Sequence, residues 1–141
     1  AYFANMQANV LEPMLFCGDT LFSAGCGRLF EGTPAQMFAS LRQLAQLPPD
    51  TKVYCTHEYT EKNIQFALTV EPNNQALKDY QTHVAQLRQQ QQASLPSSIQ
   101  QELAVNPFLR CEQNAIKQGL NMPNADALKI FTELRARRNL F

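Results

Sequence analysis

Hydrophobic and polar positions follow different patterns on the two sides of residue 72. Up to that point, short apolar runs alternate with segments of helical periodicity, and beyond it the periodicity is helical throughout. We therefore predict a mixed α/β (α+β) fold with two parts. Residues 1–72 are expected to hold strands and helices, and residues 73–141 helices and loops.

The first part contains the expected strands. Four short apolar runs bounded by polar or turn residues predict them, and the first two runs are rich in aromatic side chains and predict a strand pair. The runs are residues 1–6, 13–17, 21–24 and 52–55. Tyr54, in the last run, is expected in the core. Three glycines after the third run, Gly25, Gly27 and Gly32, predict a loop with close backbone turns.

Capping residues mark the helices of the first part. A hydroxyl at Thr33 followed by Pro34 is a typical helix start, and the double proline Pro48-Pro49 ends that helix. Thr60 is expected to cap the next helix.

The second part reads as successive helices. From residue 73 an apolar face carries Leu77, Tyr80, Val84 and Leu87, and the glutamines of residues 89–92 form a solvated helix end. Tyr80 is expected in the core and His83 on the surface. Ser98 and Gln101 have the spacing of a capping box. The last helix ends in a basic turn, where cations suit the helix dipole; its arginines are Arg135, Arg137 and Arg138.

Composition excludes several functional classes. The chain has 141 residues, 45% of them hydrophobic, which favours a packed core over disorder. Lys plus Arg and Asp plus Glu number 12 each, so the neutral chain gives no reason to expect binding to nucleic acid or to an anionic membrane. No apolar run approaches ~18 residues, so we expect no membrane-spanning segment.

Cysteine usage indicates a reducing compartment. The four cysteines form no Cys-x-x-Cys pair, and Cys17 and Cys55 lie in apolar runs, where a free thiol acts as a small hydrophobic group. We therefore expect free cysteines and a cytoplasmic location.

Two polar residues follow predicted strands and are candidates for chemistry. Asp19 comes after the second apolar run and His57 after the fourth, and strand ends in layered α/β proteins are where ligand sites form. A carboxylate and an imidazole suit Zn²⁺, Fe or Mn²⁺. The alternative is that Asp19 caps a turn and His57 is a hydrogen-bonded structural histidine. Spacing alone favours the alternative, because two ligands are too few for a metal site.

Longer segments resemble glyoxalase II, a branch of the metallo-β-lactamase superfamily. An Asp-Thr pair near a strand end is shared across that superfamily, and the Gly-Cys-Gly-Arg and His-Glu-Tyr runs narrow the resemblance to this branch. The similar stretches are FCGDTLFSAGCGRLFEGT at residues 16–33, VYCTHEYT at 53–60, NPFLR at 106–110 and LRARRNLF at 134–141. They extend over nearly the whole chain.

The resemblance implies a fold and a metal centre. Residues 1–72 would be the second half of an αββα sandwich, and residues 73–141 an all-helical substrate-binding region. Asp19 would bridge two divalent metals, Zn²⁺ with Fe or Mn²⁺ as alternatives, and His57 would be a terminal ligand to one of them. The family's further histidine ligands lie upstream of the segment that corresponds to Ala1. We therefore expect this chain to be the C-terminal portion of an enzyme and to be inactive by itself.

The resemblance also assigns residues to substrate binding. Arg28 and Tyr59 would contact glutathione, and Arg135 and Arg138 would hold one of its carboxylates, since guanidinium groups match carboxylates well. Phe30 falls where some members have Tyr, so it would line the pocket without a hydroxyl. The alternative for the arginines of the last helix is a solvated helix terminus.

The implied reaction is hydrolysis of the thioester S-D-lactoylglutathione to D-lactate and glutathione by a metal-bound hydroxide. Half a sandwich would expose a sheet face, so we expect self-association. The rival hypothesis is a non-catalytic module that binds glutathione or another partner.

Overall fold

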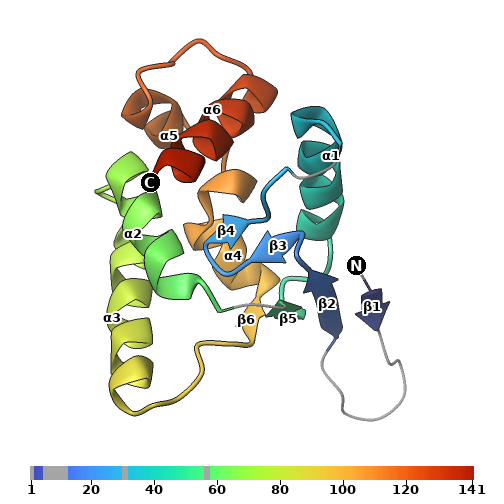
Figure 1. The fold of residues 1–141 in the computed structure, drawn as a ribbon, viewed down its shortest axis with the longest axis vertical. Helices are drawn as coiled ribbons and strands as arrows, with labels where there is room; N and C mark the ends of the chain where they lie inside the picture. The colour runs from blue at the N-terminus through green and yellow to red at the C-terminus, as the bar shows by residue number, and fades with distance from the viewer. Residues whose placement is uncertain (1, 5–12, 30–31, 56–57) are drawn as a thin grey trace.

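A small mixed sheet, a short hairpin and a group of helices make up the fold in the computed structural model, which describes residues 2–4, 13–29, 32–55 and 58–141 (Figure 1). The strands are β1 (Tyr2–Ala4), β2 (Met14–Gly18), β3 (Leu21–Phe22), β4 (Gly25–Cys26), β5 (Lys52–Cys55) and β6 (Ser97–Ser98). The helices are α1 (Pro34–Ala45), α2 (Thr60–Val70), α3 (Gln75–Gln89), α4 (Ile99–Val105), the 3₁₀ helix η1 (Pro107–Leu109), α5 (Asn114–Gly119) and α6 (Ala127–Leu140). The predicted mixed α/β class is confirmed.

The four-stranded sheet has the order β1-β2-β5-β6, and β3 and β4 form a separate two-stranded hairpin. β2 pairs with β1 in antiparallel and with β5 in parallel orientation, as expected from a crossover that contains α1. The predicted strand pair at the start of the chain is therefore present. The single strand predicted over residues 21–24 is instead β3 and the start of a turn, because Ala24 adopts a positive φ of 58° that ends the strand.

One face of the sheet is covered and the other is open. In β2, Leu15 and Cys17 are buried and Phe16 between them is 44% exposed, as the two-residue period of a strand requires. In β5, Val53 is buried and Tyr54 is 37% exposed, stacked on Phe16 with ring centroids 5.4 Å apart. The prediction that Tyr54 lies in the core is wrong, because it alternates with the buried Val53 and faces away from the core.

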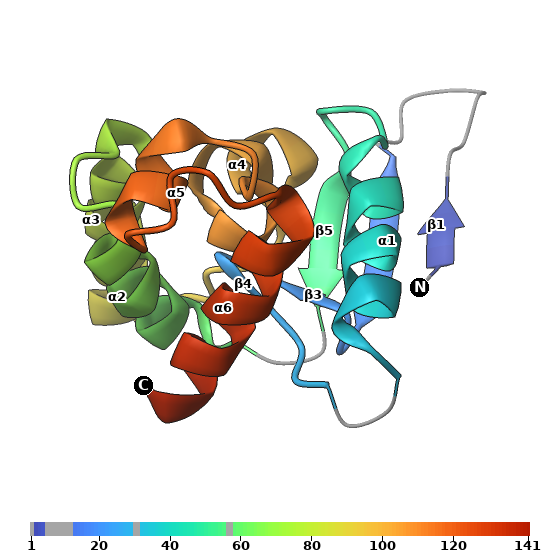
Figure 2. The same ribbon diagram turned by 90° about the horizontal axis from the view of Figure 1, so that it is seen from above.

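Helix α1 lies beside β2 and β5 (Figure 2) and packs against α6 and η1. Its start is as predicted: Thr33 Oγ1 accepts from the Gln36 backbone N–H, and Gln36 Oε1 accepts from the Thr33 N–H at 2.9 Å. The helix ends at Ala45, before the two prolines. Its buried Leu41 joins the main core.

The start of α2 differs from the prediction. Thr60 is the first helical residue and not the cap; Tyr59 is at the N-cap position and its side chain makes no capping hydrogen bond. Ser94 donates through its N–H and its hydroxyl to the Glu58 carboxylate, and its Oγ also lies within hydrogen-bond distance of Thr60 Oγ1, at 2.9 Å. These bonds attach the start of α2 to the connection that follows α3.

The part beyond residue 72 is not purely helix and loop, which corrects the prediction. Strand β6 pairs antiparallel with β5, Ser98 opposite Lys52 and Ser97 opposite Val53. Two serines are too short a segment to show a strand period, so the pattern could not indicate it. The Ser98 cap is confirmed, since its hydroxyl accepts from the Gln101 N–H at 3.1 Å and opens α4. His83 is exposed and Tyr80 is buried, as predicted.

A continuous core joins the sheet to the helices. Leu15 and Val53 from the sheet belong to the same buried cluster as Phe108 and Phe131 from the second part. Both sides of residue 72 therefore contribute to one core, and the boundary there stays a prediction.

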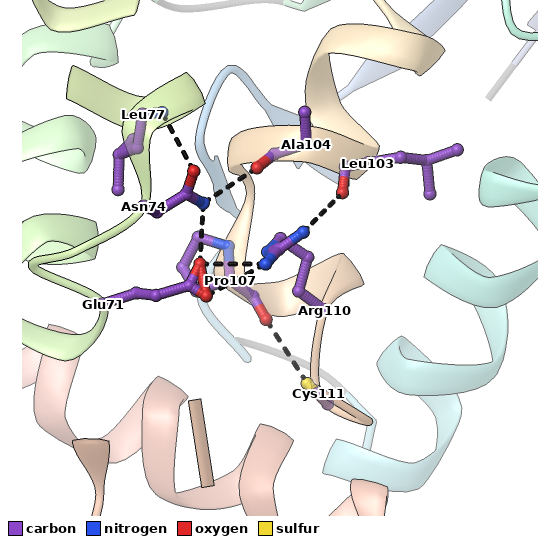
Figure 3. A network of polar contacts seen from close by, with 8 residues as sticks. All are labelled: Glu71, Asn74, Leu77, Leu103, Ala104, Pro107, Arg110 and Cys111. Atoms are coloured by element: carbon purple, nitrogen blue, oxygen red, sulfur yellow. Dashed lines mark hydrogen bonds and ion pairs between the residues drawn. The ribbon is translucent and has the colours of Figure 1, made fainter. Parts of the chain in front are cut away.

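A polar clamp also ties helix ends together around Glu71 (Figure 3). Arg110 Nη2 lies 3.0 Å from both Glu71 carboxylate oxygens, and Arg110 Nη1 donates to the Leu103 carbonyl at 3.2 Å. Asn74 Nδ2 donates to Glu71 Oε1 at 2.6 Å and to the Ala104 carbonyl at 2.9 Å. The clamp thus connects the end of α2, the start of α3, the end of α4 and η1.

Across the described ranges, none of the helices combines the length and the apolar character that crossing a membrane requires.

Candidate functional site

A cavity of about 490 Å³ lies between the β3–β4 hairpin, α2 and α6. Residues far apart in the sequence meet there, and the cavity brings together the predicted site residues that the structure describes: Asp19, Arg28, Tyr59, Arg135 and Arg138. The other two predicted site residues, Phe30 and His57, lie outside the described residues. Phe22, Lys62 and Asn63 also contribute to the wall.

Close backbone packing in the hairpin sets the positions of Asp19 and Arg28. Gly27 donates its N–H to the Thr20 carbonyl at 3.1 Å, which closes the loop between the two residues. A Cβ added at Gly27 would lie 1.9 Å from the Asp19 carbonyl oxygen, so no side chain fits at this position. The second glycine of the Gly-Cys-Gly-Arg run is therefore required for steric reasons. The turn that it allows brings the exposed carboxylate of Asp19 and the exposed guanidinium of Arg28 to the same wall of the cavity.

A buried carboxylate supports the hairpin from behind. Glu102 of α4 is fully buried; its Oε1 accepts from the Ala24 N–H at 2.7 Å, and its Oε2 accepts from the hydroxyls of Ser23 and Ser97. Burial raises the pKa of Glu102, and the hydrogen bonds to its oxygens oppose that rise. Glu102 was not predicted as a functional residue, although its spacing of three from the apolar Ile99 and from Val105 places it on the buried face of α4.

Arg135 approaches the hairpin from α6 and is only 4% exposed. Its Nη1 donates to the carbonyls of Cys26 at 2.7 Å and Gly27 at 3.2 Å, and its guanidinium lies 5.3 Å from the centre of the Phe108 ring. Arg135 Nε is buried and has no hydrogen-bond partner among the described residues. For Arg135, the alternative of a solvated helix terminus is therefore wrong: it lies one helical turn after the buried Phe131, on the same face.

Arg138 is held by an amide. Its Nε and Nη2 both donate to Asn63 Oδ1, at 3.3 and 3.2 Å, and Asn63 is itself only 5% exposed. Burial lowers the pKa of Arg138, and the nearby cations Arg135 and Arg28 lower it further. The three guanidinium groups therefore lie close together and all stay protonated, because a guanidinium stays charged at all physiological pH values.

Tyr59 stands at the rim of the cavity. It is 50% exposed, and its ring makes an edge contact with the buried Phe22, with ring centroids 5.3 Å apart. The Tyr59 ring therefore packs on an apolar side chain that holds it in place, and it is accessible from the cavity.

The cavity wall is cationic. Arg28, Lys62, Arg135 and Arg138 contribute four positive charges and Asp19 one negative charge. Guanidinium groups bind carboxylates with paired, charge-assisted hydrogen bonds. The arrangement therefore suits an organic anion with more than one carboxylate.

A metal centre is not assembled by the described part of the chain, where no three His, Cys, Asp or Glu side chains group closely enough to hold an ion. Burial raises the pKa of Cys26 to about 11 and that of Cys17 to about 12, so both thiols are protonated at neutral pH in the metal-free protein. The described cysteines are free, as predicted.

Comparison with known proteins gives one consistent result. A family described as "Hydroxyacylglutathione hydrolase C-terminus" matches residues 58–141. A hydroxyacylglutathione hydrolase of Shewanella baltica (strain OS155) is 57% identical over 141 aligned positions, covering 95% of this chain and 54% of the relative. Proteins of the same name from Methylobacillus flagellatus and Pseudomonas aeruginosa are 56% and 53% identical, each over 92% of this chain and 52% of the relative. The chain thus spans about half the length of the curated relatives it matches.

Proposed function

Because this chain belongs to the hydroxyacylglutathione hydrolase family, we propose that it forms the glutathione-binding part of a thioester hydrolase. The reaction of the complete protein would be hydrolysis of S-D-lactoylglutathione to D-lactate and glutathione. Residues 1–72 would be the second half of an αββα sandwich and residues 73–141 the substrate-binding region. The 141-residue chain alone would be inactive.

The observation that carries the proposal is the shared cavity. Five residues that the resemblance assigns to the site come from three separate stretches of the chain, and all five line one cationic cavity. Four of them have the chemistry that glutathione needs. Arg28, Arg135 and Arg138 suit its carboxylates, and Tyr59 offers an aromatic face and a hydroxyl at the rim.

The role of these residues is to bind and orient the thioester. Holding glutathione by its carboxylates would fix the acyl group relative to Asp19, so that attack on the carbonyl needs no further loss of rotational freedom. Water adds to the thioester carbonyl, the C–S bond breaks, and the departing sulfur takes a proton as glutathione. Asn63 and the hairpin carbonyls keep Arg138 and Arg135 in place in the free protein.

The metals implied by the family would supply a hydroxide nucleophile at neutral pH. Asp19 and His57 are the two ligands that this chain would contribute. The proposed contribution of this chain is therefore the binding of the substrate together with those two ligands.

Steady-state kinetics of the complete protein tests the proposal, with Arg138→Ala compared against Arg137→Ala. Arg137 is the matched control, because it is adjacent in sequence but pairs with Glu133 at 2.7 Å away from the cavity wall. We expect Arg138→Ala to raise KM for S-D-lactoylglutathione about tenfold and Arg137→Ala to leave it near the wild-type value. The isolated chain with added Zn²⁺ should show no turnover above background. A complete protein without thioesterase activity, or equal effects of the two substitutions, would contradict the proposal.

A second candidate function is a glutathione-binding module without catalysis. It is favoured by one observation: the cationic side chains of the cavity wall all come from this chain. Both candidate functions predict that the isolated chain binds glutathione, so an activity assay of the complete protein separates them. Hydrolysis of S-D-lactoylglutathione supports the hydrolase, and glutathione binding without turnover supports the module.

A further inference from the structure

The seven arginines of the chain divide into two groups by what holds them. Arg42, Arg88, Arg110 and Arg137 each lie within 3.4 Å of a glutamate carboxylate oxygen. The remaining three are the cavity arginines, Arg28, Arg135 and Arg138. In the described ranges, no ion pair with a carboxylate involves any of these three, although Asp19 lines the same cavity.

Neutral acceptors take the place of carboxylates in the cavity. Two backbone carbonyls orient Arg135, at 2.7 and 3.2 Å. The Asn63 amide oxygen orients Arg138, at 3.3 and 3.2 Å from its Nε and Nη2. These contacts fix the geometry of the guanidinium groups but leave their net positive charge uncompensated. An ion pair such as that of Arg110 with Glu71 would fix the geometry and cancel the charge at the same time.

Both the nitrogen and the oxygen of the Asn63 amide are held by hydrogen bonds. Its Nδ2 donates to the Ser23 carbonyl at 3.1 Å, so its Oδ1 must be the atom that faces Arg138. The side chain is almost fully buried, and a Cβ added at Gly25 would lie 2.6 Å from its Nδ2. Asn63 thus spans from the hairpin to α6, with little room to turn.

We propose that Asn63 is a positioning residue for Arg138, and that its neutrality keeps the charge of that guanidinium available to a ligand carboxylate. The inference rests on the proposed function, in which glutathione supplies the carboxylate. An aspartate of the same size would keep an acceptor for Arg138, but it would form an ion pair with it. The second oxygen of that aspartate would also face the Ser23 carbonyl, acceptor against acceptor.

Calorimetric titration of the 141-residue chain with glutathione, repeated at several ionic strengths, tests this. The proteins compared are the wild type, Asn63→Asp, Asn63→Ala and Asn73→Asp. Asn73→Asp is the matched control, since it adds the same charge at an exposed position beyond the far end of α2. Circular dichroism verifies that each variant is folded, and Asn63→Ala covers the case in which the aspartate variant does not fold.

We expect Asn63→Asp to bind glutathione at least about tenfold more weakly than the wild type, with a smaller salt dependence of the affinity, because one of the four cationic side chains of the wall is then paired. Asn63→Ala should also bind more weakly but keep the salt dependence, because it removes the positioning and not the charge. Asn73→Asp should behave like the wild type. If Asn63 had only a structural role, Asn63→Asp and Asn63→Ala would not differ in salt dependence.

Two results would overturn the inference, and they are distinguishable. Wild-type affinity and salt dependence in Asn63→Asp would show that the neutrality of Asn63 is irrelevant, and would leave the proposed function standing. A wild-type chain that does not bind glutathione at all would remove the proposed glutathione site, and the role of Asn63 with it.

Discussion

Gly27 and Arg135 set the geometry of the cavity wall at the residue scale. A side chain at Gly27 would collide with the Asp19 carbonyl oxygen, so only glycine allows the loop between Asp19 and Arg28 to close. Arg135 is buried and donates to the Cys26 carbonyl, which joins the last helix to the hairpin at one side of the cavity.

Glu58 carries a prediction at the residue scale. Its pKa is lowered, chiefly by the hydrogen bond from the Ser94 hydroxyl, with further lowering by the Ser94 N–H and Arg88, against a smaller opposing effect of burial. A carboxyl group with a lowered folded-state pKa adds stability above its unfolded-state value, and that stability is lost as the pH falls through the folded-state value. The relevant window therefore begins near the ordinary value of 4.5 and extends below it.

We accordingly expect Glu58→Gln to lower the free energy of unfolding at neutral pH, and the difference from the wild type to shrink as the pH falls below 4.5. Urea denaturation of both proteins over a pH series measures it. A difference that stays constant over the whole series would mean that the carboxylate form of Glu58 contributes nothing.

At the scale of elements, the strength of the local signals decided which predictions held. The caps at Thr33 and Ser98 are short-range hydrogen bonds, and both are present. Strand β6 was missed because a pair of serines has no period, and its pairing with β5 is a long-range contact. Tyr54 was misplaced because the run of residues 52–55 is too short to reveal which of its side chains face the core.

The Glu71–Arg110 clamp carries the prediction for the elements. Glu71→Ala leaves the mostly buried Arg110 guanidinium without its carboxylate, which should cost about 3 kcal/mol in the free energy of unfolding. Chemical denaturation measures this loss, and the double variant with Arg110→Ala should lose less than the sum of the single variants. The control is Glu133→Ala, which breaks the exposed pair with Arg137 and should cost less than about 1 kcal/mol. Equal costs at the two pairs would contradict the assigned role of the clamp.

At the scale of the whole molecule, the sequence predicted the class of fold, and the family resemblance named five of the residues that line the cavity. The supporting groups of the cavity were not predicted: Asn63, Glu102 and the hairpin carbonyls lie between positions 23 and 102, and only the three-dimensional packing brings them to the hairpin and the cavity arginines. Self-association through the open sheet face, with Phe16 and Tyr54 exposed, stays a prediction.

The central claim is that the cavity between the hairpin, α2 and α6 binds the carboxylates of glutathione. The most direct measurement is an NMR titration of the chain with glutathione that follows the side-chain Nε–H signals of all seven arginines. The signals of Arg28, Arg135 and Arg138 should shift together with glutathione concentration, while those of Arg42, Arg88, Arg110 and Arg137, which already pair with glutamates, should stay in place. Shifts confined to the paired arginines, or no shift at any arginine, would contradict the claim.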